Sequence, residues 1–543
     1  MEARGKNGFS SQLSFPRRPA RPRPSYSDTP SNVNLARCLQ LLQTRSSATR
    51  RADTPRKRGE RGRLFASPSL AGRDGAEDGV GVEARWDQRI CVQARYDSNH
   101  HEWHPIPPHI YSFPSADIHP TARGDVPQIT PIQYRPFKWG PKYHITMGLK
   151  SLPHSEWFEL DNEYATYQRI RRGRIESKGR EILRIIPSDK VGDGTVVRGE
   201  RIAQGVVELL LATAEYLAQR YPESFTLDSK TRTITNRVLG ETHQLPTSIW
   251  ADEKYGILRE VSLEEGEAAL RTCALLVPDD LALLTEGADG KYYLQGGAIL
   301  VPGTWRLREK LGMKLEDIHV EGKVPRYEQA LRPSMDRYFA RLAVDKPVVR
   351  VNYGVQVLPS QPSESSPTTN LTSGAVDDPD ELAWAATTMG EEFPDESPAK
   401  DDHDIANGVQ PEWSGDLRRH AHTAEVRPER LRLRVERQTL RRLPGTGIIV
   451  FGIRTYRYLI SDIKDEVEYG VTAATFGKEN SAPPSPDSVM AGKEEHTASK
   501  KENKSVGARL ASALRSWPDD VRRYKGGHTW GDTVIEYLES KSS

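Results

Sequence analysis

The stretch LRLRVERQTLRRLPGTGIIVFGIRTYRYLI, residues 431–460, decides the fold. Apolar and charged residues alternate over 431–435, and this period of two predicts a β-strand. Residues Ile448–Tyr458 are rich in β-branched and aromatic types, which predicts a second, buried strand. Proline and glycine between the two runs indicate a tight turn. We interpret Gln438–Arg442 as a helical or irregular turn that precedes it.

This stretch also concentrates charge beside a predicted core strand. Its polar cluster consists of Glu436, Arg437, Gln438, Arg441 and Arg442. Such a cluster is either a solvated edge or the lining of an anion site, and the sequence leaves both open.

Composition excludes several classes of protein. The chain has 543 residues, a formal net charge of +2 and 36% hydrophobic residues, so a good part of it is expected to stay unpacked. The small net charge argues against a dedicated nucleic-acid-binding protein. Three widely separated cysteines, Cys38, Cys91 and Cys273, predict neither a disulfide framework nor a cysteine-based zinc site. No apolar run is long enough for a membrane span.

Changes in composition divide the chain. We predict one domain in three parts, 132–357, 429–476 and 506–541. A basic region at 1–125, an acidic insertion at 358–428 and a second insertion at 477–505 are predicted to be disordered. The Arg- and Ser-rich start leaves a mitochondrial presequence open as the alternative to a cytoplasmic protein with a basic tail.

Outward from the opening stretch, periodicity predicts mixed helices and strands. A clean apolar stripe predicts a helix over Glu200–Tyr221, and Ser262 with Glu265 forms a capping box for another that ends near Leu276. Further predicted elements are a strand at Tyr143–Leu149, a helix at Glu156–Arg172 ended by Gly173, a strand at Tyr292–Val301, a helix at Trp305–Leu311 capped by Thr304, a helix at Pro333–Leu342 and a strand at Lys346–Val357. Without a βαβ rhythm, these elements predict an α+β fold with a largely antiparallel sheet.

Common nucleotide-binding and hydrolase motifs are absent, but several long segments resemble one family. They are RPFKWGPKYHITMGL, LDNEY, LATAEYLAQRYP, VPGTWRLREKLGMKLEDIHVEGKVP, RVNYGVQV and LRVERQTLRRLPGTGIIVFGIRTY, in this order. The chain therefore resembles the haem-dependent oxidative N-demethylase family, formerly a domain of unknown function, whose fungal members are called HRQ family proteins.

The resemblance implies a PAS-like fold that binds haem b. It implies a haem-binding oxidoreductase that oxidises the N-methyl group of a small amine with O2 and releases formaldehyde. Electrons would come from NADPH through a separate flavin and iron–sulfur reductase, because no dinucleotide fingerprint or ferredoxin-type cysteine cluster occurs in this chain.

The same resemblance suggests site residues. A neutral imidazole is a common axial ligand of haem iron, so His319 is the first candidate for the metal ligand and His144 the second. Arginine suits the haem propionates, which points to Arg437 and Arg350, with Gln438 beside them. Asp280 is the candidate carboxylate for a cationic amine, and a purely structural role as a helix cap is the alternative.

Two rival functions stay open at this stage. A PAS-like protein can be a non-catalytic haem-binding sensor or interaction protein, since fold alone does not fix function. A member without haem that acts as a scaffold through its acidic insertion is the third hypothesis.

Overall fold

The computed structural model describes residues 96–97, 102–111, 117–143, 146–186, 200–358, 382–389, 391–393, 426–467 and 505–540. Within them, helices surround a largely antiparallel sheet, so the predicted α+β fold is confirmed, whereas the PAS-like likeness stays a prediction. No helix of these residues is both long and apolar enough to cross a membrane.

A seven-stranded sheet is the centre of the fold, and its strands follow the order β3-β12-β13-β14-β10-β11-β4. All of the strand pairings in this sheet are antiparallel. The strands are β3 (Lys150–Ser151), β4 (Leu183–Ile185), β10 (Asp280–Glu286), β11 (Tyr292–Ala298), β12 (Val348–Val357), β13 (Leu431–Arg442) and β14 (Ile449–Leu459).

Smaller sheets accompany it. They comprise β1 (Tyr96–Asp97) with β2 (Glu102–Trp103), β5 (Phe225–Asp228) with β6 (Thr233–Asn236) and β7 (Glu241–Gln244), and β8 (Trp250–Asp252) with β9 (Ile257–Leu258). The helices with described bounds are α3 (Tyr164–Lys178), α4 (Glu200–Arg220), α5 (Leu263–Leu276), α6 (Leu307–Lys310), α7 (Leu315–Glu321), α8 (Arg332–Arg341), α10 (Ala386–Met389), α12 (Ile460–Lys464), α13 (Val506–Arg515), α14 (Asp519–Tyr524) and α15 (Gly527–Glu539). A π-helical turn, η5 (Tyr327–Leu331), lies between α7 and α8.

The pairing register of the long β13–β14 hairpin shows which side chains lie on which face of the sheet. Residues directly opposite each other in an antiparallel pair point to the same side. Gln438 lies opposite Arg350 of β12, whereas Arg437 lies opposite Val351. We call these two sides the Gln438 face and the Arg437 face.

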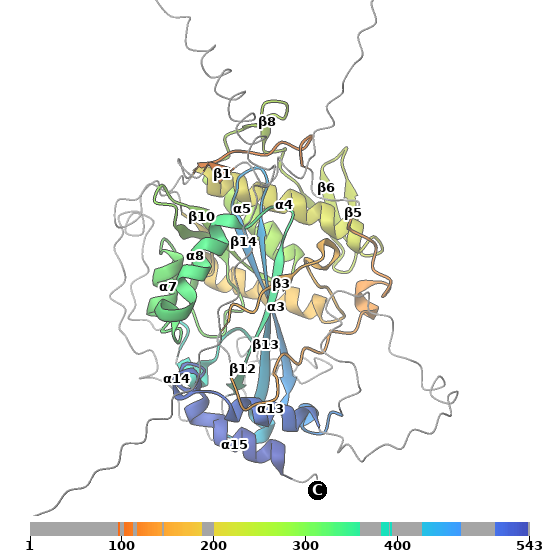
Figure 1. Ribbon diagram of the computed structural model, residues 1–543. Helices are drawn as coiled ribbons and strands as arrows, with labels where there is room; N and C mark the ends of the chain where they lie inside the picture. Colours follow the sequence, from red (N-terminus) through yellow and green to blue (C-terminus); the bar gives the residue numbers. More distant parts are fainter. Residues whose placement is uncertain are drawn as a thin grey trace, which may run out of the picture. The chain divides into compact units, whose positions relative to one another are not determined.

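Helices cover these faces in groups (Figure 1). On the Arg437 face, α4 and α5 pack at the turn end of the hairpin, and the C-terminal helices α13–α15 pack at the opposite end. On the Gln438 face, α7 and α8 share an apolar cluster with Leu440 and Phe451. The hairpin is therefore covered by apolar clusters on both of its faces.

The opening prediction needs one correction. Gln438–Arg442 is not a turn, because β13 continues to Arg442 and pairs with β12 and β14 over these residues. Both faces of this part of the strand carry polar side chains, so the period-two contrast that marks a strand is lost. The turn itself is as predicted, with Gly447 at a φ of +75°.

Helices with strong periodicity are confirmed, and those with weak signals are shifted. Helix α4 ends one residue before the predicted end. At α5, the Ser262 hydroxyl accepts a hydrogen bond from the Glu265 amide at 3.1 Å, as the capping box predicts.

Several predicted boundaries and roles are wrong. Helix α3 begins at Tyr164 rather than Glu156 and continues through Gly173 to Lys178, where Gly179 ends it at a φ of +52°. Helix α6 begins at Leu307 with Arg306, not Thr304, at its cap. The segment 146–149 is not a strand, and only Lys150–Ser151 pairs with β12. Asp280 opens strand β10 and caps no helix.

A short segment within the range 358–428 packs against the domain. Leu382 and Trp384 are buried, and Gly303 exchanges backbone hydrogen bonds with this segment at 2.7 and 2.8 Å. Glu392 forms a buried ion pair with Arg174 at 2.6 Å.

Candidate functional site

His319 lies on α7, which covers the Gln438 face of the sheet. Its Nδ1 donates a hydrogen bond to the carbonyl of Leu315, one turn earlier, at 2.6 Å. Its ring stacks on that of Tyr327 at a centroid distance of 4.8 Å and an interplanar angle of 14°. Because Nδ1 carries the proton, the lone pair is on Nε2.

Electrostatics keep this imidazole neutral. Burial is the main cause that lowers the pKa of His319 to about 4; the positive charges of Lys310 and Arg350 add to this shift, and the Leu315 carbonyl opposes it. A neutral imidazole with one fixed proton and one free lone pair is the form that binds a metal ion.

The link after α7 has an unusual backbone. Lys323 and Arg326 have φ values of 52° and 55°, a conformation that residues other than glycine seldom adopt. The π-helical turn η5 follows at once and carries Tyr327 against His319. Positive φ values and π-helical turns concentrate at functional sites, where the surrounding structure holds them in place.

The Gln438 face presents polar side chains beside this helix. Glu436 accepts hydrogen bonds from Gln438 Nε2 at 3.1 Å and from Asn352 Nδ2 at 3.4 Å. The Arg434 guanidinium also pairs with Glu436 at 3.2 Å. From the C-terminal helices, Lys525 donates to Asn352 Oδ1 at 3.0 Å.

Two cations, Arg350 and Lys310, lie close enough to His319 to lower its pKa. The Nε of Arg350 is buried without a hydrogen-bond partner, and burial lowers the pKa of this guanidinium. The ammonium of Lys310 lies 4.7 Å from the Trp305 ring centroid, and burial lowers its pKa to about 8 although Glu309 and Glu321 oppose the shift. Cations in such surroundings favour an anion that would pair with them.

Arg437 lies on the other face, away from this site. Its guanidinium forms an ion pair with Glu159 at 2.8 Å and donates to the carbonyls of Glu156 and Trp157. The resemblance pointed to a haem propionate as the partner of Arg437, whereas in the structure its guanidinium is engaged by Glu159 and two backbone carbonyls. The role of Arg437 as a cofactor ligand is therefore a prediction that this geometry does not support.

Asp280 is enclosed and fully used by structural partners. Its carboxylate pairs with Arg171 at 2.7 Å and accepts hydrogen bonds from the amides of Leu300 and Val301 at 2.9 and 2.8 Å. With 1% of its surface exposed, it joins the start of β10 to the chain after β11. A role in binding an amine stays a prediction without support from this arrangement.

The structure thus divides the predicted site residues. It places His319, Arg350 and Gln438 on one side of the sheet, and it places Arg437 on the opposite side. His144 lies outside the described residues.

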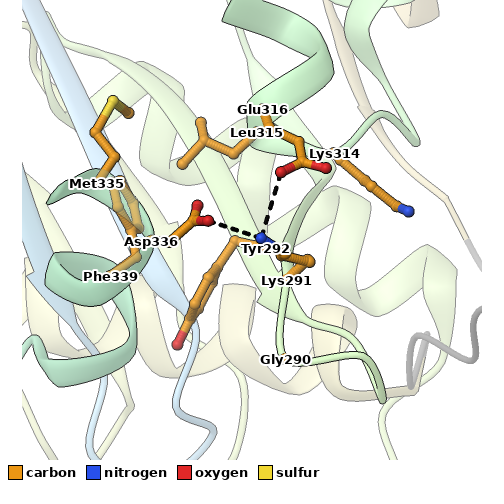
Figure 2. Close-up of a pocket in the computed structure, with 9 residues that line it drawn as sticks. All are labelled: Gly290, Lys291, Tyr292, Lys314, Leu315, Glu316, Met335, Asp336 and Phe339. Carbon is orange, nitrogen blue, oxygen red and sulfur yellow. Dashed lines mark hydrogen bonds and ion pairs between the residues drawn. The ribbon is translucent and has the colours of Figure 1, made fainter. Parts of the chain in front are cut away.

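A small pocket adjoins the start of α7 (Figure 2). Its empty volume of about 280 Å³ includes space open to solvent. Lys291 reaches Asp336 at 2.7 Å and Glu316 at 3.3 Å, while Tyr292, Met335 and Phe339 form the apolar wall. This volume is below the usual range for cofactor sites, so the pocket as it stands does not hold a large cofactor.

Comparison with protein families decides the affiliation. Residues 148–476 match the family model described as haem-dependent oxidative N-demethylase, alpha subunit-like. The chain belongs to this family. The match includes α7, the site face of the sheet and the whole β13–β14 hairpin, whereas Lys525 and the C-terminal helices lie beyond it.

The residues around His319 fit the haem that the family name implies. An unprotonated Nε2 suits iron, and the guanidinium of Arg350, whose Nε is buried without a hydrogen-bond partner, suits a propionate carboxylate. The aromatic ring of Tyr327 supports the imidazole, and its own hydroxyl is buried without a hydrogen-bond partner. These donor types, an imidazole nitrogen and a guanidinium, therefore match a ligand of haem iron and a nearby partner for a propionate carboxylate.

Sequence reasoning missed two members of this site. Tyr327 follows the positive-φ link, and nothing in local periodicity predicts its stacking on His319. Lys310 is on a one-turn helix whose charged residues resemble an ordinary solvated surface. Neither residue carries a sequence signal, because both contacts depend on how separate helices pack.

Proposed function

We propose that this member of the family is a haem b-binding oxidoreductase that removes an N-methyl group from a small amine as formaldehyde. The observation that carries the proposal is the neutral imidazole of His319, whose lone pair is on Nε2, near the buried and unpartnered Nε of Arg350, inside the residues that match the family.

The overall reaction balances with one O2 and two electrons. One oxygen atom enters a C–H bond of the methyl group, and the resulting carbinolamine breaks its C–N bond to give formaldehyde and the demethylated amine. The other oxygen leaves as water after two electrons from NADPH and two protons are added. A separate flavin and iron–sulfur reductase would supply these electrons, which agrees with a family described as alpha subunit-like.

The chain's own residues orient the cofactor and shield it. Bound haem would supply the oxygen-activating chemistry. His319 would bind the iron through Nε2 while the Leu315 carbonyl fixes the ring's tautomer. Arg350 and Lys310 would neutralise the propionates, and Gln438 would hold Glu436 in place beside them. No carboxylate is assigned to the amine, since Asp280 is engaged elsewhere.

Absorption spectroscopy after haem reconstitution tests the binding step. We expect a Soret band that shifts on reduction, and we expect His319→Ala to lose or shift it, with rescue by added imidazole. His243→Ala is the matched control, because His243 is another partly buried histidine with a burial-lowered pKa but lies on β7. A reconstituted wild-type protein without a Soret band would refute the proposal.

Turnover tests the second step. Reconstituted protein with NADPH, a flavin and iron–sulfur reductase, O2 and dimethylamine should release formaldehyde in equal amount to the monomethylamine formed. Haem binding without formaldehyde from dimethylamine or related methylamines would instead favour the sensor function.

A further inference from the structure

Asp279 is a buried carboxyl group that the proposed function does not use. It lies between α5 and β10, has 0% of its surface exposed, and neither of its carboxyl oxygens has a hydrogen-bond partner in the described part of the chain. Its neighbour Asp280, by contrast, is fully paired. A buried polar group without partners requires a physical explanation.

The surroundings of Asp279 form a buried ionic layer at the start of β10 that includes Arg437 and Arg454 from the Arg437 face of the sheet. Its ion pairs are Arg171–Asp280 at 2.7 Å, Arg437–Glu159 at 2.8 Å and Arg454–Asp161 at 3.2 Å. Each of these arginines already has its own carboxylate. Asp279 is thus the additional acid in this layer, and as a carboxylate it would be a buried charge without a counter-ion of its own.

Other polar atoms without partners face the same place. Arg454, which bonds Asp161 through Nη2, leaves Nε and Nη1 buried and unpartnered. Gln168 of α3 is 1% exposed, and both its amide atoms lack partners. Gln168 lies on the helical stripe between Tyr164, which donates to the Leu276 carbonyl, and Arg171, which donates to the Asp279 carbonyl. It therefore faces the segment that carries Asp279.

Two general facts connect these observations. Buried polar atoms that protein groups leave unpaired are commonly satisfied by internal water. A buried carboxyl group without a counter-ion takes up a proton instead of remaining charged. We propose that Asp279 is a proton-holding neutral carboxyl group that internal water connects to Arg454 and Gln168.

The charges around Asp279 give the direction of its pH dependence. Burial raises the pKa of Asp279 to about 7; Arg437, Arg454 and Arg171 act to lower it, and Glu159 raises it. In the unfolded chain the pKa of an aspartate is about 4. Between about pH 4 and pH 7 the folded protein holds a proton that the unfolded chain has lost, so stability decreases as pH rises through this window. Above it the effect is constant.

Thermal unfolding of the full chain between pH 5 and pH 8 tests the proposal with a matched pair. Asparagine mimics a neutral carboxyl group, so the difference in Tm between Asp279→Asn and wild type should be smallest at pH 5. The variant should become progressively more stable than wild type as pH rises to 7. Asp161→Asn, in the same layer but ion-paired, should lower the Tm at neutral pH.

The opposite result is easy to recognise. If Asp279→Asn lowers the Tm at pH 7 as Asp161→Asn does, Asp279 is a paired carboxylate and the proposal is wrong. Infrared spectroscopy of the wild-type protein provides a second readout that requires no folded variant. A protonated carboxylic acid band at pH 6 that weakens by pH 8 supports the proposal, and its absence at pH 6 overturns it. A crystal structure with no water between Asp279 and Arg454 would refute the proposed water connection between them.

Discussion

Glu208 should stabilise the turn of the β13–β14 hairpin by holding its backbone amides. This helix α4 residue is buried, and its carboxylate accepts hydrogen bonds from the Gly445 amide at 2.7 Å, the Thr446 amide at 2.9 Å and the Thr446 hydroxyl at 2.7 Å. Glu208→Ala would leave these three donors without their acceptor. The perturbation therefore acts on the element that connects the two long strands.

The expected loss follows from these three contacts. Hydrogen bonds to a charged group contribute about 1.5–3 kcal/mol each, and a buried donor left unpaired costs about 1–3 kcal/mol. Two effects reduce the sum: water can enter the vacated space, and the substitution removes a carboxylate whose pKa burial raises. We expect a net loss of roughly 3 kcal/mol in the free energy of unfolding.

Urea unfolding followed by tryptophan fluorescence measures this loss, with an unchanged m-value showing that the variant unfolds in the same way. Glu215→Ala is the control, because Glu215 is on the same helix but is only partly buried, and it accepts a hydrogen bond from the Gln219 side-chain amide at 3.1 Å. Its loss should stay within about 1 kcal/mol. If Glu208→Ala lowers the free energy of unfolding no more than the control does, Glu208 does not stabilise the turn.

Further predictions concern packing at the same hairpin and in the core. Gly447→Ala should lower the free energy of unfolding by about 2 kcal/mol or more, because the φ of Gly447 is +75° and an added Cβ atom would lie 2.2 Å from Trp103. Gly354→Ala is the control: its added Cβ would meet nothing within 4 Å, so its free energy of unfolding in the same urea assay should be nearly unchanged. The Cys273 thiol is fully buried with its pKa raised by burial, so a thiol reagent should label it only in urea, as peptide mass spectrometry would report. Labelling of Cys273 in native buffer at the rate of a free thiol would contradict its burial.

Much of the fold could be predicted where local chemistry and tertiary packing agree. Helix α4 has an apolar stripe over its whole length, and α5 has a capping box that the structure confirms. The hairpin turn is encoded by proline and glycine. The sequence failed at α3, because the acidic residues before Tyr164 resemble a helix start but instead supply Glu159 and Asp161 to the buried ionic layer.

The chemical types of the candidate site residues could be predicted from the sequence, but not all of the residues that form the site. Imidazole and guanidinium groups in specific motifs pointed to His319 and Arg350, and the structure places both on the same side of the sheet. Tyr327 and Lys310 joined them only through the packing of short helices against the sheet. Their contacts depend on helix positions that one-dimensional periodicity does not contain.

Residues 431–460 show which features of the fold the sequence alone does not determine. By itself, the sequence determined a strand at 431–435, a second strand at 448–458, a tight turn between them and an unusual density of arginine beside the core. Only the tertiary structure decided that β13 continues to Arg442, which turns Arg437 and Gln438 to opposite faces. Consecutive residues of a strand alternate in direction, so strand continuity fixes the face of each side chain. The partner of each residue is then set by what packs there: Glu159 for Arg437, and Glu436 for Gln438.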